Sequence, residues 1–340
     1  MGDRVDTQFS RYDIAAWALA ALALFAILQS GLLAALLSGL LVYQLVHVFA
    51  ARLVRIGLTQ GAGRVAAVVV VSFVTVALLT LGAVKVFNLL TGSPENLAAL
   101  LQKMAEAIET ASQHYPPWAQ DYLPATADEL EAQASGWLRE HATELRTAGE
   151  AFARALGHIV FGMIIGGLAS LNEVQQNTDR RPLARALGTR AEHLGDAFRR
   201  VVFAQMRISA LNTTLTSIYL VFILPLFGIN LPFIKTMIAV TFFAGLLPIL
   251  GNLISNTVIV VVSLSVTLYA AVAALLFLIF IHKLEYFVNA RIIGGQIFAR
   301  AWEILLAMLV MESIFGIQGV IAAPIYYAYL KRELSAHKLI

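Results

Sequence analysis

Long apolar runs constrain the fold of this chain more than any other feature of its sequence. A transmembrane helix needs about 20 largely apolar residues, because each residue adds 1.5 Å to a path of about 30 Å. Two runs of nearly this length, 12–28 and 32–48, are joined by a tight turn. Further runs follow at 65–90, 155–171, 201–227, 233–250, 253–281 and 304–330. The sequence therefore predicts an all-α polytopic membrane protein with about eight transmembrane helices.

The composition agrees with this class. Only 13% of the 340 residues are charged, whereas a soluble domain carries roughly 25%. The net charge of +3 does not indicate nucleic-acid binding, because Lys and Arg lie in short loops between apolar runs, as cytoplasmic loops require. The chain has no cysteine, which excludes disulfides, thiol nucleophiles and Cys-ligated metals. No cleavage-site pattern follows the first run, so we expect it to be a retained span rather than a signal peptide.

Changes in composition divide the chain into five parts. An acidic segment with two amphipathic helical patterns follows the third run, and an arginine-rich segment follows the fourth. We expect the acidic segment to be outside and the basic one inside, with both termini cytoplasmic. The predicted parts are 1–92 with spans one to three, 93–154 as an extracytoplasmic helical insert, 155–171 as span four, 172–200 as a cytoplasmic basic helical segment, and 201–340 as a C-terminal membrane domain.

The loop 282–300 does not fit eight complete crossings. It carries Lys283, Arg291 and Arg300 but would lie outside, against the usual distribution of basic residues. The alternative is that 232–263 and 302–330 re-enter the bilayer as half-helix pairs, the second turning near Gly316. Many secondary transporters build their sites from such discontinuous helices.

Glu312 lies deep in an apolar run, where a charge is expensive unless it faces protein or a water-filled cavity. Two interpretations remain open: a proton carrier on a transport route, or a buried structural contact to another helix. The first predicts that Glu312→Gln abolishes the pH dependence of transport.

A second polar group follows a bend at Pro248–Gly251. Asn252, Ser255 and Asn256 come directly after it, and proline leaves a backbone carbonyl without its helical donor. These groups could line a polar pocket, coordinate sodium, or simply form a hydrogen-bonded helix break.

The last candidates surround the polar loop. Glu285 and Asn289 are four residues apart, on one face if the stretch is helical, with Arg291 nearby. They could bind substrate, pair with each other, or cap a helix at the membrane interface. Hinge or close-packing positions are expected at Pro248, Gly251, Gly294, Gly295, Gly316, Gly319 and Pro324.

No catalytic motif is present. The sequence contains no Walker A loop, no H-E-x-x-H and no G-x-S-x-G, and its histidines lack metal-ligand spacing. We therefore expect no enzyme activity, no cofactor and no metal, and transport that is secondary or facilitated.

Three motifs resemble the autoinducer-2 exporter family of bacterial membrane proteins. They are L-L-P-I-L-G-N at 246–252, L-E-Y-F-V-N-A-R-I-I-G-G at 284–295 and I-F-G-I-Q-G-V-I-A-A-P at 314–324. The resemblance implies a bacterial inner-membrane exporter of small polar molecules such as autoinducer-2, forming homo-oligomers, pentameric by resemblance. Some members resemble sodium–proton antiporters, so Na⁺ or H⁺ are candidate coupling ions.

The chain departs from the family pattern at four positions. Ala290, Asn252 and Trp302 stand where proline is usual, and Glu312 stands where a small residue is more common. These departures leave the fold expectation intact and put the substrate in doubt. The expected function is export of a small polar solute; the alternatives are a cation–proton antiporter and a non-transporting membrane scaffold.

Overall fold

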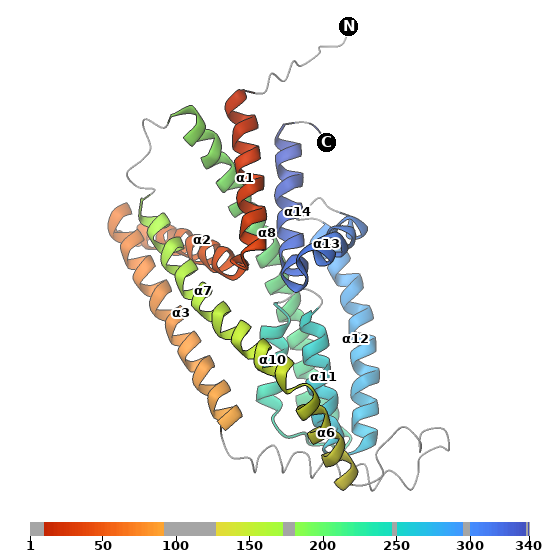
Figure 1. Cartoon of the computed structure of the whole chain (residues 1–340). Helices are drawn as coiled ribbons and strands as arrows, with labels where there is room; N and C mark the ends of the chain where they lie inside the picture. Colours follow the sequence, from red (N-terminus) through yellow and green to blue (C-terminus); the bar gives the residue numbers. More distant parts are fainter. Residues whose placement is uncertain are drawn as a thin grey trace. The chain divides into compact units, whose positions relative to one another are not determined.

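The computed structural model describes residues 10–91, 127–172, 181–246, 250–294, 300–337 and 339. Every element assigned in those ranges is helical, which confirms the expected all-α class (Figure 1). The first five helices are α1 Arg11–Gln29, α2 Leu33–Arg55, α3 Gln60–Thr91, α6 Ala127–Glu140 and α7 Ala142–Asn172. The rest are α8 Pro182–Ile218, the π-helix η2 Tyr219–Ile223, α9 Leu224–Leu226, α10 Ile234–Ala244, α11 Leu250–Leu264, α12 Leu268–Gly294, α13 Ala301–Phe315 and α14 Ile317–Ala336.

Among the described residues, four helices are long and apolar enough to cross a membrane. They are Arg11–Gln29, Leu33–Arg55, Ala142–Leu171 and Pro182–Leu226. Shorter apolar helices cover Gly61–Ala77, Ile234–Ala244, Gly251–Leu264 and Leu268–Ile281. The chain is therefore a multi-pass membrane protein, and the number of complete crossings stays a prediction.

The division of the chain into five parts stays a prediction, and two of its boundaries, at residues 154 and 200, fall inside helices. Residues 93–126 of the expected insert lie outside the described residues, and its remainder forms α6 and the start of α7. Helix α7 then runs past residue 154 into the fourth apolar run without a break. The basic segment similarly becomes the first half of α8, which continues into the fifth run.

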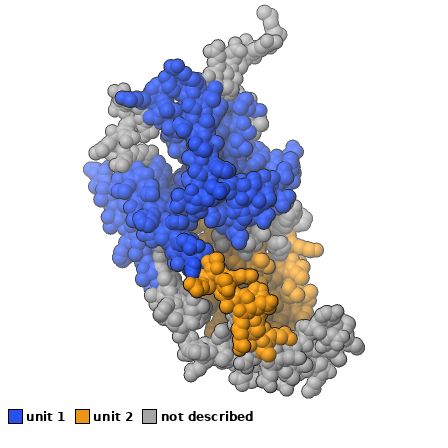
Figure 2. All heavy atoms as spheres, viewed as in Figure 1, with its two compact units in different colours: residues 1–82, 150–202, 294–340 blue, residues 83–149, 203–293 orange. Residues whose placement is uncertain are grey.

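The chain forms two compact units, coloured separately in Figure 2. Unit 1 contains Met1–Gly82, Glu150–Val202 and Gly294–Ile340, and unit 2 contains Ala83–Gly149 and Phe203–Ile293. Each unit has its own buried core and is described by itself below.

In unit 1, helices α2 and α7 pack at backbone contact. A Cβ atom on Gly162 would overlap the carbonyl oxygen of Ala35, and one on Gly166 would overlap that of Gly39. Ser38 Oγ donates to the Ile159 carbonyl at 3.0 Å across the same interface. Gly162 and Gly166 are four residues apart, on one face of α7, and small residues in this arrangement let transmembrane helices approach closely.

Also in unit 1, the last apolar run is a helical hairpin rather than one helix. Helix α13 ends at Gly316, whose φ of +60° and ψ of −144° form a conformation open essentially only to glycine. Helix α14 then runs back along α13. Hydrogen bonds from Tyr327 and Lys331 of α14 to Glu303, near the start of α13, show this antiparallel arrangement. Of the two expectations for this run, a continuous span and a hairpin turning near Gly316, the structure shows the helix break of the second.

In unit 2, the run expected as a single span over 253–281 is also divided. Helix α11 ends at Leu264 and α12 starts at Leu268, where Thr267 Oγ1 accepts from the Ala270 N–H at 3.0 Å. Helices α10 and α11 are short neighbours that pack on each other. The core includes Tyr219, which stacks on Phe277 with ring centroids 3.7 Å apart.

Candidate functional site

Helix α8 carries a polar stripe inside its apolar, membrane-length half. Gln205, Ser209, Asn212 and Thr216 are spaced at i, i+4, i+7 and i+11, which places them on one face of the helix. Ser209, Asn212 and Thr216 are all buried. Polar groups at this depth are costly unless they are bonded or serve a pathway.

The polar stripe bonds to the segment where α10 ends and α11 begins. Gln205 Nε2 donates to the Gly245 carbonyl at 2.7 Å, and Ser209 Oγ donates to the Phe242 carbonyl at 2.6 Å. These acceptors belong to the last turn of α10 and its cap, whose carbonyls have no helical N–H to accept from. The helix break thus supplies hydrogen-bond acceptors to the apolar half of α8.

One turn further along α8, two amide side chains meet. Asn212 Nδ2 donates to Asn252 Oδ1 at 3.1 Å. Asn252 lies at the start of α11, directly after Gly251, where a Cβ atom would overlap the Ala244 carbonyl oxygen. The glycine therefore brings α10 and α11 close enough for the amide to reach α8.

We call Gln205, Ser209, Asn212, Asn252 and Ser255 the polar seam. Ser255 is buried one turn after Asn252 and donates weakly to its carbonyl at 3.4 Å. The side chains of the seam are uncharged amides and hydroxyls, so they can donate to and accept from a neutral polar solute. They offer no carboxylate or thiolate for metal binding, and no group of metal-ligating side chains occurs in the described residues.

Several hydroxyls beside the polar seam have unused bonding capacity. Thr213 Oγ1, Thr216 Oγ1, Tyr219 Oη and Ser263 Oγ are buried and find no hydrogen-bond partner among the described residues. The π-helix η2 begins at Tyr219, just ahead of Pro225, and single π turns are frequent at functional sites. Buried polar groups in proteins normally form hydrogen bonds. These hydroxyls could therefore form hydrogen bonds with a polar solute bound in unit 2.

The structure brings only some of the predicted site residues together. Asn252 joins the polar seam, and Asn256 lies half-buried one turn beyond it on α11. Pro248 and Gly295 fall outside the described residues. Glu285, Asn289, Arg291 and Gly294 belong to the last turns of α12, and their side chains are outside what the structure describes.

Glu312 lies on the exposed face of α13. No described residue bonds its carboxylate, whereas its backbone carbonyl accepts from the Gly316 N–H at 2.7 Å. The intramolecular contact that the sequence left open for Glu312 is thus not observed among the described residues. Gly319 is buried where a Cβ would overlap the Met311 carbonyl oxygen, and Pro324 is buried inside α14.

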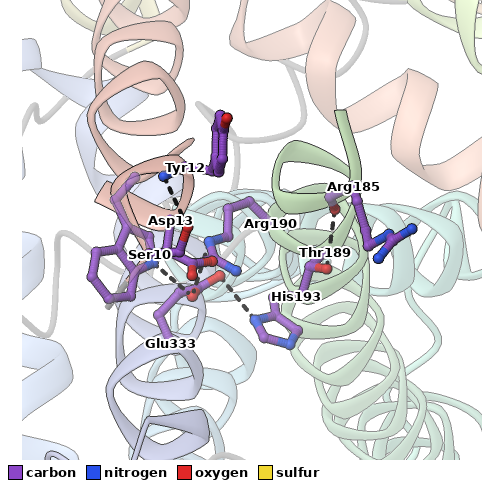
Figure 3. Close-up of polar contacts among 9 residues, drawn as sticks. Ser10, Tyr12, Asp13, Arg185, Thr189, Arg190, His193 and Glu333 are labelled. Carbon is purple, nitrogen blue, oxygen red and sulfur yellow. Dashed lines mark hydrogen bonds and ion pairs between the residues drawn. The ribbon is translucent and has the colours of Figure 1, made fainter. Parts of the chain in front are cut away.

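A charged cluster that the sequence did not predict joins three helices of unit 1 (Figure 3). Arg190 of α8 donates from Nη2 to Asp13 of α1 at 2.9 Å, and its Nε lies 3.6 Å from Oε2 of Glu333 on α14. Glu333 also accepts from Trp17 Nε1 at 3.0 Å, and its Oε1 lies 2.8 Å from Nδ1 of His193. The Arg190 guanidinium stacks over the Trp17 ring at 5.1 Å.

We call these five residues the clamp. The Arg190 and Glu333 side chains are only 4% and 6% exposed, so removing either one would weaken the charge compensation of the other in a buried site. A weak sequence signal existed: Arg190 and His193 are three residues apart, and each lies four residues from an alanine, Ala186 or Ala197, in a segment whose composition indicates only that it is basic. Glu333 follows Lys331 and Arg332 directly after the last apolar run, where charged residues at the end of a membrane helix are common.

A second polar contact holds the ends of the α13–α14 hairpin together. Oε2 of Glu303 accepts from Lys331 Nζ at 2.8 Å, from Tyr327 Oη at 2.8 Å and from the Arg300 backbone N–H at 3.0 Å. The Lys331 hydrogen bond first, then those of Tyr327 and Arg300, lower the pKa of Glu303 from 4.5 to about 2. This carboxylate lies before the apolar run, at the start of α13.

Acid should therefore loosen the hairpin. A carboxyl group whose pKa is lowered in the folded state contributes stability above its unfolded pKa, and loses it as pH falls through the folded pKa. Between pH 4.5 and 2, the melting temperature should fall more steeply for the natural protein than for Glu303→Gln, measured by circular dichroism in detergent. Parallel curves for the two proteins would show that Glu303 does not hold the hairpin.

Comparison with known protein families assigns nearly the whole chain to one family. A family model described as AI-2E family transporter matches residues 14–337, nearly the full length, and includes the polar seam and every clamp residue except Asp13. No curated protein and no solved structure gives a significant match. The extent of the family match, together with the multi-pass helical structure, shows that this chain belongs to the AI-2E family of membrane transporters.

Proposed function

We propose that this protein is a secondary transporter that exports a small polar solute, such as autoinducer-2 or a similar signal or metabolite. The observation that carries the proposal is the polar seam: amides and hydroxyls of α8 and α11 meet inside membrane-length apolar helices, beside a helix break. A non-transporting scaffold would gain nothing from polar groups at this depth, where each costs free energy.

The chemistry of the polar seam favours a neutral solute over an ion. A hydroxylated or carbonyl-bearing molecule can exchange its bonds to water for bonds to Asn212, Asn252 and the free hydroxyls, which offsets the cost of leaving water. No charged side chain belongs to the seam.

The membrane topology that we propose has two re-entrant hairpins. Helices α11 and α13 have 15 residues each and extend about 22 Å at 1.5 Å per residue, less than the bilayer core of about 30 Å. A hairpin over 302–330 returns to the side from which it started, so the basic loop 282–300 joins Lys331 in the cytoplasm. This arrangement removes the conflict with the distribution of basic residues and supports cytoplasmic termini in a bacterial inner membrane.

Efflux from liposomes tests the function. Purified protein is reconstituted, autoinducer-2 is loaded, and its release is measured for the natural chain, Asn212→Leu and Asn252→Leu. Each substitution should slow release about tenfold, because a hydrogen bond worth about 1.4 kcal/mol is lost from the path.

The matched control is Thr214→Val. Thr214 is exposed on the same helix and bonds only the Ala210 carbonyl of its own turn, at 2.8 Å, so its removal should leave efflux unchanged. Equal rates for both asparagine variants and the natural chain would overturn the proposed route, and no flux above protein-free liposomes would favour the scaffold.

A cation–proton antiporter is the second candidate, and Glu312 favours it. Its carboxylate is exposed on an apolar helix without a described partner, a position suited to carrying a proton or to meeting a second subunit in a homo-oligomer, a pentamer by resemblance. Sodium-driven proton flux that Glu312→Gln abolishes, while autoinducer-2 efflux is absent, would decide for the antiporter.

A further inference from the structure

We propose that Glu312 of one copy of this chain forms an ion pair with Arg207 of a second copy, and that the exposed faces of α13 and α8 around them are a contact between subunits. The proposal rests on the membrane topology proposed above, in which both segments enter the bilayer from the cytoplasm. It goes beyond the solute path, because neither residue belongs to the polar seam.

Glu312 is an acid on an exposed apolar face and has no partner in its own chain among the described residues. It lies on α13 inside the apolar run 304–330, and no described residue bonds its carboxylate. Leu305 and Leu309, on the same side of the helix, are 58% and 66% exposed. Ionisable residues in membrane segments normally face protein or water and pair with one another. A partner outside the chain is therefore expected to cover this carboxylate.

Arg207 on α8 has the complementary charge in the same situation. It lies inside the apolar run 201–227, its side chain is exposed, and no described residue bonds its guanidinium. Ala210 and Thr214, three and seven residues further along, continue the exposed face of α8. Both are small, and small residues let a second membrane helix approach closely.

The other charges in the apolar runs do not offer an equivalent pair. Among the side chains that the structure describes, these runs contain the acids Asp13 and Glu312 and the bases Arg207 and Lys235. Asp13 is bonded to Arg190 of the clamp. Lys235 is exposed, but it follows the turn after the fifth apolar run and so lies at the end of that span away from the cytoplasm.

Glu312 and Arg207 lie at nearly the same depth in the proposed topology. From 201 to 207 is six residues and from 304 to 312 is eight, which at 1.5 Å per residue places the two charges about 9 Å and about 12 Å inside the cytoplasmic ends of their runs. The long arginine side chain spans this difference. In an oligomer with closed symmetry, each copy supplies one acid and one base, so both charges of every copy are paired.

Charge reversal tests this pairing. Glu312→Arg and Arg207→Glu are each expressed as a mixture of copies with two different affinity tags, and the recovery of the second tag after capture of the first is measured in detergent. Each variant alone places like charges at the contact. Recovery of the second tag should therefore fall at least about tenfold relative to the natural chain, because like charges facing each other in an interface are strongly unfavourable.

Mixing the two variants shows whether the pair joins separate chains. When a Glu312→Arg chain with one tag is co-expressed with an Arg207→Glu chain with the other, positions 312 and 207 of neighbouring copies again carry opposite charges. Recovery of the second tag should return to the level of the natural chain. The same recovery should be seen for the chain that carries both substitutions. Restoration also shows that each variant folds.

The matched control is Lys235→Glu, which reverses the charge of the other exposed base. Alone it should assemble like the natural chain, and it should not restore assembly when co-expressed with Glu312→Arg. The proposal is wrong if the natural chain gives no second-tag recovery, or if the single variants keep full recovery, as pairing within one chain would produce. A mixture of the two variants that stays separate, or rescue by Lys235→Glu, also overturns it. The assay measures assembly without transport, so its failure is distinguishable from absent efflux.

Discussion

Arg190→Ala is expected to destabilise the protein by about 3–5 kcal/mol, because it leaves the buried carboxylate of Glu333 without its counter-ion. Glu333 is 6% exposed and Asp13 is bonded to the same guanidinium. Alanine also removes the cation that stacks on Trp17. The measurement is the free energy of unfolding from chemical denaturation in detergent, followed by circular dichroism.

The control for this experiment lies on the same helix. Arg185 is exposed, and no described residue bonds its guanidinium, so Arg185→Ala should change the free energy of unfolding by no more than about 0.5 kcal/mol. If Arg190→Ala and Arg185→Ala had equal small effects, the clamp would not stabilise unit 1. Arg190→Lys should recover part of the loss, since it restores the charge without the fork of donors.

Gly319→Ala is expected to prevent normal closure of the α13–α14 hairpin. The added Cβ atom would overlap the backbone carbonyl oxygen of Met311, and a backbone atom, unlike the end of a flexible side chain, has little room to shift. Overpacking typically costs 1–3 kcal/mol, occasionally more. We expect a loss of about 3 kcal/mol in the free energy of unfolding, together with a large loss of efflux.

Gly157→Ala tests the same chemical change where there is space. Gly157 lies on α7, and a Cβ there would meet nothing within 4 Å. Alanine should stabilise that helix by up to about 1 kcal/mol, because glycine has a lower helix propensity. A tolerated Gly319→Ala, as stable and active as Gly157→Ala, would contradict the hairpin packing.

The features that the sequence predicted are those encoded locally. The length of the apolar runs predicted membrane helices, and Gly319 was expected at a close-packing position, where a Cβ atom would overlap the Met311 carbonyl oxygen. Gly316 was expected to mark a break, and it ends α13 with a positive φ. Each of these signals depends on a few neighbouring residues, so no knowledge of the tertiary fold was needed.

The features that the sequence did not predict depend on pairing between distant residues. Trp17 and Glu333 are 316 positions apart, and Arg190 and Asp13 are 177 apart. Without the fold, the members of the clamp read as ordinary loop and helix-end charges. The polar seam was predicted only in part: Asn252 was a candidate site residue, but its partner Asn212 was not. The spacing of Gln205, Ser209 and Asn212 in an apolar run could have indicated a polar face of the helix.

The most direct test of the polar seam as the solute route is cysteine accessibility, since the natural chain contains no cysteine. Ser255, 2% exposed in the seam, and Leu253, 67% exposed on the apolar surface of α11, are replaced singly by cysteine. Both variants are treated in liposomes with a small, water-soluble thiol reagent. We predict that Ser255→Cys reacts, that the solute slows its reaction, and that Leu253→Cys, facing lipid, does not react. An unreactive Ser255→Cys in a protein that still transports would contradict a solute path through the seam.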